Sequence, residues 1–260
     1  MIPWQIVGLG LTLVACRPEP EIITTDTGSD AETGSPDSGD TGPLDTSEPA
    51  ETGSVDTGDT VDSTGGLGSI EGDCGVLNAE RLTDESTELW QNVLDLDDGF
   101  DAEQASAGGV EIWEAGNLGG SSLESEVVAF EVLHHCEGAE LLQTESEIPY
   151  VDDGGKKTDM LVTVDDVSVG VSVTRAYHYP PEEGYTEEEA SDLLEGKLGD
   201  ILQSAANAQD PWARSLLHVI AYDEDHAQSV QLAYQELDGS LTQSTLVFLT
   251  ITDGQDSEVY

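Results

Sequence analysis

"KKTDMLVTVDDVSVGVSVTRAYHY", residues 156–179, contains the clearest signal for a pair of β-strands in this sequence. It contains two runs, 157–164 and 167–176, that are rich in valine and threonine, which are residues enriched in β-strands. Between the runs lie Asp165 and Asp166, a connection short enough for a hairpin. The stretch therefore predicts two neighbouring antiparallel strands.

Helix-like and strand-like segments surround this hairpin in a regular order. In chain order the expected elements are helix 121–136, strands 139–151, 157–164 and 167–176, helix 185–211, strand 213–222, helix 223–237 and strand 244–252. Thr186 and Glu189 form a capping box at the start of the clearest helix, and a serine with a glutamate behind it is expected to cap the start of the helix at 121–136. The order predicts an α/β fold, with a mixed β-sheet flanked by helices on both faces. Residues 74–117 show no pattern that supports a prediction.

The order of elements resembles that of the PD-(D/E)XK nuclease-like superfamily, a restriction-endonuclease-like core of α-β-β-β-α-β, here with an extra α-β. In that superfamily, acids on the first helix and on the second and third strands hold divalent ions. The resemblance places Asp159 of the dipeptide "TD" at the aspartate position of the second strand. Glu126 is the candidate on the first helix, with Glu124 and Glu131 as rivals.

The positions on the third strand depart from the superfamily pattern. They fall on Ser172 and Thr174, where the pattern requires an acid and a lysine. A hydroxyl is a weak neutral ligand, and threonine supplies no positive charge. Lys197, within the apolar stripe of helix 185–211, is a possible relocated lysine. The favoured interpretation is instead that its stem covers apolar surface and its ammonium group pairs with Asp200.

Other polar residues near the hairpin are weaker candidates. Arg175, together with Lys156 or Lys157, flanks the hairpin and could hold an anion. His178, with Tyr177 and Tyr179, follows the third strand, where loops often carry function, and is a further candidate for a polar site. His218 lies in a continuous apolar run, so we expect a hydrogen-bonded histidine in the core.

The chain is strongly acidic, with 7 basic and 55 acidic residues and a net charge of −48. One basic and 15 acidic residues precede Cys74, which leaves six basic residues against 40 acidic ones from there to the end. Long-range repulsion at this charge disfavours nucleic acid as a partner. The acidity fits adaptation to a saline habitat equally well. The sequence contains no GxSxG, no glycine-rich phosphate loop and no HExxH.

The first residues have the features of an export signal. Residues 1–16 are apolar and too short to span a bilayer, and they end in "LVAC" at residues 13–16. These four residues resemble the lipobox of bacterial lipoproteins, in which the signal is cut before the cysteine and the cysteine is acylated. The resemblance implies that Cys16 is the lipidated N-terminus. The alternatives are an apolar start that is not processed and a start codon placed too far downstream.

The rest of the chain divides into a spacer and a domain. Residues 17–72 are rich in Asp, Thr, Gly and Ser, and we expect a disordered spacer that holds its domain about 40 Å from the membrane. Residues 73–260 are expected to form a single globular domain. Cys74 and Cys136 remain after lipidation, so an oxidising compartment predicts one disulfide. A metal site at "HHC", residues 134–136, is disfavoured because neighbouring side chains on a helix point in different directions.

Together these features predict a lipoprotein of the cell envelope, periplasmic or at the cell surface. Its nuclease-like domain is expected to be catalytically degenerate, with a binding or structural role, no cofactor and a monomeric state. The membrane is the expected partner, through the lipid, and no protein partner is identified. The alternative is an active Mg²⁺-dependent nuclease that uses Asp159 and Glu126 as metal-binding acids, with Lys197 as the relocated lysine.

Overall fold

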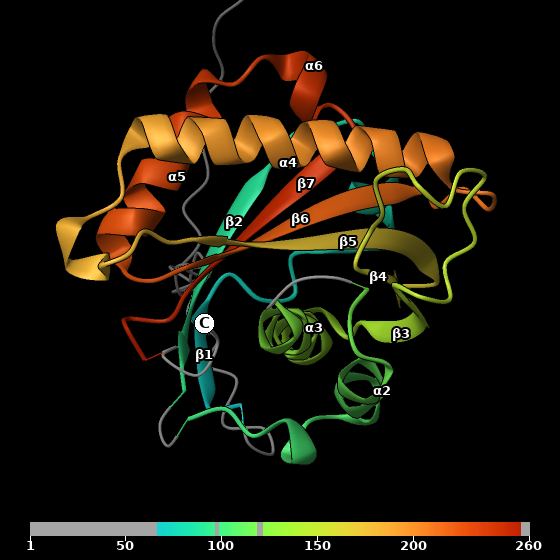
Figure 1. The fold of residues 1–260 in the computed structure, drawn as a ribbon, viewed down its shortest axis with the longest axis horizontal. Coiled ribbons are helices and arrows are strands. Elements are labelled where there is room, and N and C mark those ends of the chain that lie inside the picture. The colour runs from blue at the N-terminus through green and yellow to red at the C-terminus, as the bar shows by residue number, and fades with distance from the viewer. Residues whose placement is uncertain (1–66, 97–98, 119–121, 256–260) are drawn as a thin grey trace, which may run out of the picture. The chain divides into compact units, whose positions relative to one another are not determined.

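A seven-stranded mixed sheet runs through the protein, with helices on both of its faces (Figure 1). The computed structural model describes residues 67–96, 99–118 and 122–255. The strands are β1 Ser69–Gly72, β2 Leu89–Asp95, β3 Glu140–Thr144, β4 Met160–Val164, β5 Val167–Ala176, β6 Arg214–Ala221 and β7 Thr245–Ile251. The helices are α1 Ala79–Thr83, α2 Ala107–Ala115, α3 Leu123–Glu137, α4 Glu187–Asn207, α5 Glu224–Glu236 and α6 Gly239–Thr242.

The strand order across the sheet is β1-β2-β7-β6-β5-β4-β3. Strands β2, β7, β6 and β5 are parallel, whereas β1, at one edge, and β4, beside β5, pair antiparallel with their neighbours. From α3 to β7 the order of helices and long strands is α-β-β-β-α-β-α-β apart from short α6, as the sequence predicts. The predicted α/β fold class is therefore confirmed.

The β4–β5 hairpin forms as its turn residues require. Asp165 and Asp166 both have positive φ, at 49° and 64°, which is the backbone conformation of a type I′ turn. The turn fixes Val164 opposite Val167 and leads to Met160 opposite Val171. Asp159 therefore comes directly before β4, beside the carboxyl-terminal half of β5.

Each face of the sheet has its own hydrophobic core. On one face α3 packs against alternate residues of β4 and β5, and on the other α4 and α5 cover β6 and β7 (Figure 1). The α3 core includes Val127, Phe130, Leu133, Met160, Val169, Val171 and Phe248. The α4 core includes Ala190, Leu194, Leu198, Ile201, Leu217, Val219 and Leu249. The capping box of Thr186 and Glu189 is present at the start of α4, as predicted.

Two predicted details of the local structure are wrong. The strand predicted at 139–151 ends at Thr144, because the Glu147 carboxylate accepts hydrogen bonds from the Thr144 backbone N–H and hydroxyl, both at 3.0 Å, and closes a turn. The serine cap predicted for the helix at 121–136 does not form at Ser122, since its hydroxyl donates to Glu126 instead of accepting from the backbone of the first turn.

The sequence predicted neither of the two N-terminal strands, β1 and β2, which enlarge the sheet. Strand β1 lies within 17–72, the stretch expected to be spacer, because Leu67 and Ile70 are buried in the α3 core. The folded part therefore begins no later than residue 67, and residues 17–66, the rest of the predicted spacer, lie outside the described residues. Cys74 and Cys136 lie at disulfide-bonding distance, with their Cα atoms 4.7 Å apart, as predicted.

We predict opposite effects for two glycine-to-alanine substitutions. A Cβ atom at Gly170 in β5 would lie 2.4 Å from the indole ring of Trp212, so Gly170→Ala should lower the free energy of unfolding by about 1–3 kcal/mol. At Gly196 in α4 a Cβ would meet nothing within 4 Å, and Gly196→Ala should raise it by about 0.5–1 kcal/mol. Urea unfolding measures both values, and equal stability of the two variants would contradict this packing.

Candidate functional site

A polar cavity of about 420 Å³ lies at the carboxyl end of β5. Ligands of α/β proteins bind at this end of parallel strands, because the loops and helix starts there leave room for polar groups. The cavity is lined by the start of α3, the residue before β4, the end of β5 and one residue of α4. These residues are Ser122, Ser125, Asp159, Val173, Thr174, Arg175, Tyr177 and Lys197.

Asp159 is held in the cavity by the backbone of β5. Its Oδ2 accepts a hydrogen bond of 2.6 Å from the Val173 N–H, and its own N–H donates to the Val171 carbonyl at 3.1 Å. Burial raises the pKa of Asp159 to about 6, although the hydrogen bond from Val173 and the positive charge of Lys197 oppose the increase. Asp159 therefore lies within electrostatic reach of Lys197.

Glu126 approaches the same place from α3. Its side chain is buried, with 3% of the residue exposed, and its Oε1 accepts a hydrogen bond of 2.9 Å from the Ser122 hydroxyl. Burial raises the pKa of Glu126 to about 7, and the negative charge of Asp159 adds to the increase. The structure thus brings together the two carboxyl groups that the sequence places on the first helix and the second strand.

Lys197 lines this cavity, and its favoured partner in the sequence prediction is wrong. The Asp200 carboxylate forms an ion pair of 2.7 Å with Lys156, which lies before β4. The ammonium group of Lys197 instead influences Asp159. Lys156, from the loop before β4, therefore pairs with Asp200 in place of Lys197. This loop is distant from α4 in sequence.

The third-strand positions bring neutral hydroxyl groups toward this region. Thr174 lines the cavity, and both Ser172 and Thr174 are largely buried, at 7% and 9% exposed. The rival acid Glu131 is used elsewhere, because it accepts hydrogen bonds from the backbone N–H and the hydroxyl of Ser106. Arg175, one residue beyond Thr174, adds a second positive charge to the lining.

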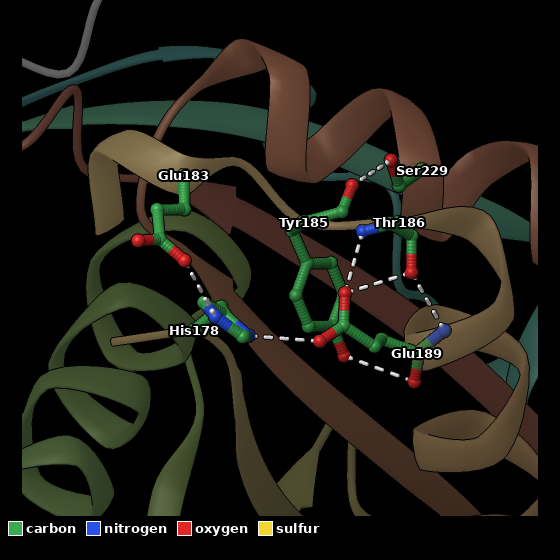
Figure 2. A network of polar contacts seen from close by, with 6 residues as sticks. All are labelled: His178, Glu183, Tyr185, Thr186, Glu189 and Ser229. Carbon is green, nitrogen blue, oxygen red and sulfur yellow. Dashed lines mark hydrogen bonds and ion pairs between the residues drawn. The ribbon is translucent and has the colours of Figure 1, made fainter. Parts of the chain in front are cut away.

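His178 belongs to a network that fastens the β5–α4 loop (Figure 2). Its Nδ1 lies 2.8 Å from Glu189 Oε1 and its Nε2 lies 3.8 Å from Glu183 Oε2. Glu189 also accepts from Thr186 in the capping box, at 2.9 Å from its N–H and 2.7 Å from its hydroxyl. The Ser229 hydroxyl of α5 donates to the Tyr185 carbonyl at 2.6 Å. The contacts of His178 are thus those of a structural residue.

The other histidines considered in the sequence also have local partners. His218 is fully buried and its Nε2 lies 2.8 Å from the Thr250 hydroxyl, so the expected core histidine is confirmed. Burial lowers the pKa of His218 to about 3. His134 bonds the Ala139 carbonyl, and His135 lies 3.3 Å from Glu131. Within the described part of the chain, no three His, Cys, Asp or Glu side chains are grouped to hold a metal ion.

The sequence did not identify every residue of the cavity. Ser122 and Ser125 line it because α3 begins beside the end of β5. Tyr177, which the sequence places beside the candidate His178, also lines the cavity, because the chain leaves β5 there. Serines before a helix are ordinary capping candidates, so no pattern in the sequence marks these two as site residues.

Comparison with known proteins assigns no family. No family model matches the chain. A Dictyostelium discoideum protein described as "AAC-rich mRNA clone AAC4 protein" is 35% identical over 150 residues, which are 55% of this chain and 22% of that protein. The chain thus spans about a fifth of the length of this relative.

A likeness to one solved structure is similarly limited. The structure of Pyrococcus furiosus SfsA in complex with Ca²⁺ has a TM-score of 0.24 and 15% identity, over 50% of this chain and 57% of that one. A TM-score of this size supports no argument, so the fold rests on the topology of the chain itself. In the ranges that the structure describes, no helix is both long and apolar enough to cross a membrane.

We predict that Glu126 makes the stability of the protein depend on pH. Its folded-state pKa of about 7 lies above the ordinary 4.5, so its stabilising contribution is complete below pH 4.5 and is lost as the pH rises through 7. The shift corresponds to at most about 3 kcal/mol. Glu126→Gln should therefore gain stability relative to the wild type between pH 5 and pH 8. Chemical unfolding at each pH measures the gain.

The control for this experiment is Glu124→Gln, which removes one negative charge two residues earlier on the same helix. The control should follow the wild-type pH profile more closely than Glu126→Gln does. If Glu126→Gln and the wild type have parallel profiles, then Glu126 does not titrate as its burial requires.

Proposed function

We propose that the protein is a lipid-anchored lipoprotein of the cell envelope whose nuclease-like domain binds a ligand without cleaving nucleic acid. The observation that carries the proposal is Thr174, whose neutral hydroxyl lies in the cavity beside Asp159 where the superfamily has a lysine. Ser172 likewise replaces the second acid. Two carboxyl groups without a third ligand from β5 are expected to bind a divalent ion weakly.

The membrane anchor in this proposal rests on the sequence. "LVAC" at residues 13–16 and the acidic tract behind it support lipidation of Cys16. The pairing of Cys74 with Cys136 fits an oxidising compartment outside the cytoplasm. A single acyl chain binds a membrane only marginally, so stable anchoring requires the additional acyl chains that lipoproteins carry.

We predict that Cys16→Ser moves the protein out of the membrane fraction. The substitution removes the only sulfur at the lipobox and with it the acyl chains that hold the protein in the bilayer. Detergent phase partitioning of the exported protein measures the change. A Cys16→Ser variant that still partitions with membranes would rule out the anchor.

A second candidate function is that of an active Mg²⁺-dependent nuclease. Lys197 favours it, because this lysine lines the cavity and its charge lowers the pKa of Asp159 against the effect of burial. The carboxylate oxygens of Glu126 and Asp159 are of the type that Mg²⁺ prefers. A bound Mg²⁺ would polarise a phosphate and acidify a water molecule. In this function Lys197 would stabilise the negative charge that develops on the phosphate.

A cleavage assay separates the two functions. The protein should leave single-stranded and double-stranded DNA and RNA intact in Mg²⁺ and in Mn²⁺, at low and at high salt. High salt is needed because it screens the repulsion between the acidic domain and the substrate. Asp159→Ala and Lys197→Ala are the site variants. Lys157→Ala is the matched control, since this lysine lies 5.7 Å from the ring centre of Tyr150 rather than in the cavity.

Metal-dependent cleavage that is lost in Asp159→Ala and Lys197→Ala, and retained in Lys157→Ala, would replace the binding proposal with the nuclease. Cleavage that is equal in all variants would come from a contaminant. The binding proposal stands if no condition yields cleavage that depends on Asp159.

A further inference from the structure

The lining of the candidate cavity holds basic side chains, which are scarce in the domain. From Cys74 to the end, the chain has six basic residues against 40 acidic ones. Two of these six, Arg175 and Lys197, line the cavity, where Asp159 is the one carboxylate of the lining, and the carboxyl groups of Glu126 and Glu145 lie within electrostatic reach of Asp159. Basic side chains that line a concave site attract anions, even within an acidic protein.

We infer that this cavity binds a small oxyanion, the phosphate or carboxylate group of a small molecule, between Arg175 and Lys197. The inference rests on the proposed function as a binding module and names the class of its ligand. Arg175 occupies none of the positions that the nuclease pattern defines. It belongs to the site because it lines the cavity.

A backbone hydrogen bond holds the carboxylate of Asp159 in place beside β5. Its Oδ2 is engaged by the Val173 N–H at 2.6 Å, which holds the carboxylate against the backbone of β5. The guanidinium group of an arginine presents paired donors that match the geometry of carboxylates and phosphates, and a lysine adds a compact positive charge. The lining thus combines two cationic donors with one carboxylate that is already hydrogen-bonded.

A neutral donor and the start of a helix complete the lining. The hydroxyl of Thr174 carries a hydrogen that can be donated to an oxyanion. The cavity also lies at the start of the 15-residue helix α3, where the helix dipole favours a negative charge. These groups add to Arg175 and Lys197, which carry the charge.

The size of the cavity and the charge around it select a small molecule over a polymer. A volume of about 420 Å³ falls within the range of small-molecule sites. A polyanion would extend beyond the cavity and meet the acidic surface, whereas a small anion contacts the lining alone. Discrimination against nucleic acid thus comes from the charge of the domain, and attraction comes from the two basic residues.

Calorimetric titration of the full-length protein with inorganic phosphate and, separately, with acetate tests the inference. Ionic strength is held constant with sodium chloride, so that a non-specific charge effect cancels. We expect saturable binding of at least one probe. Loss of a charged hydrogen-bond partner should weaken binding by about tenfold or more in Lys197→Ala and in Arg175→Ala. The control Lys157→Ala should bind as the wild type does.

A conservative variant protects the test against misfolding. Arg175→Lys keeps the charge and loses the paired donors, so it should bind more weakly than the wild type and more tightly than Arg175→Ala. The melting temperature of each variant shows whether it is folded. Binding of phosphate alone or of acetate alone identifies which oxyanion the site accepts, and either result supports the inference.

Two results would overturn the inference. One is the absence of saturable binding of both probes to the folded protein, and the other is equal binding by Lys197→Ala, Arg175→Lys and Lys157→Ala. A duplex oligonucleotide that binds more tightly than phosphate at the same ionic strength would overturn the choice of a small ligand. Metal-dependent cleavage would overturn the proposed function, whereas failure of both probes without cleavage would overturn this inference alone.

Discussion

The register of β4 against β5 is the constraint on which the candidate site depends. It is fixed by a two-residue turn in which Asp165 and Asp166 both adopt positive φ. Because side chains alternate along a strand, a shift of one residue would move Asp159 from one face of the sheet to the other. The observed register instead gives Asp159 a hydrogen bond from the Val173 N–H and places it beside the end of β5. Helices α3 and α4 then approach that point from the two faces of the sheet.

The elements that the sequence predicts well are those whose signals are local. The hairpin has its turn between two valine-rich runs, α4 has its capping box of Thr186 and Glu189, and β6 is a mostly apolar run that is buried at every residue. Strands β1 and β2 had no such signal, since β1 has four residues and β2 pairs with β7, 158 residues further along the chain. Their existence depends on partners that only the complete fold brings together.

The residues of the candidate site also divide into those that could be predicted from the sequence and those that could not. Asp159 and Glu126 could be proposed because the order of the elements resembles that of a superfamily with acids at these positions, and the structure brings their carboxyl groups together. The partner of Lys197 could not be predicted. The carboxylate that spacing along α4 assigns to it, Asp200, pairs instead with Lys156 from the loop before β4. Spacing along a helix identifies neighbours on that helix, and it says nothing about a competing residue from elsewhere in the chain.

Burial and charge act against each other in this cavity, and their balance decides its chemistry. Burial raises the pKa values of Glu126 and Asp159, which makes their ionised forms costly, while Lys197 offsets part of the effect at Asp159. Asp159 gives Lys197 a group of opposite charge within the protein, and Arg175 adds a second positive charge to the lining. The excess of acids elsewhere then limits which molecules can reach the two basic residues, because repulsion grows with the number of charges that a ligand carries.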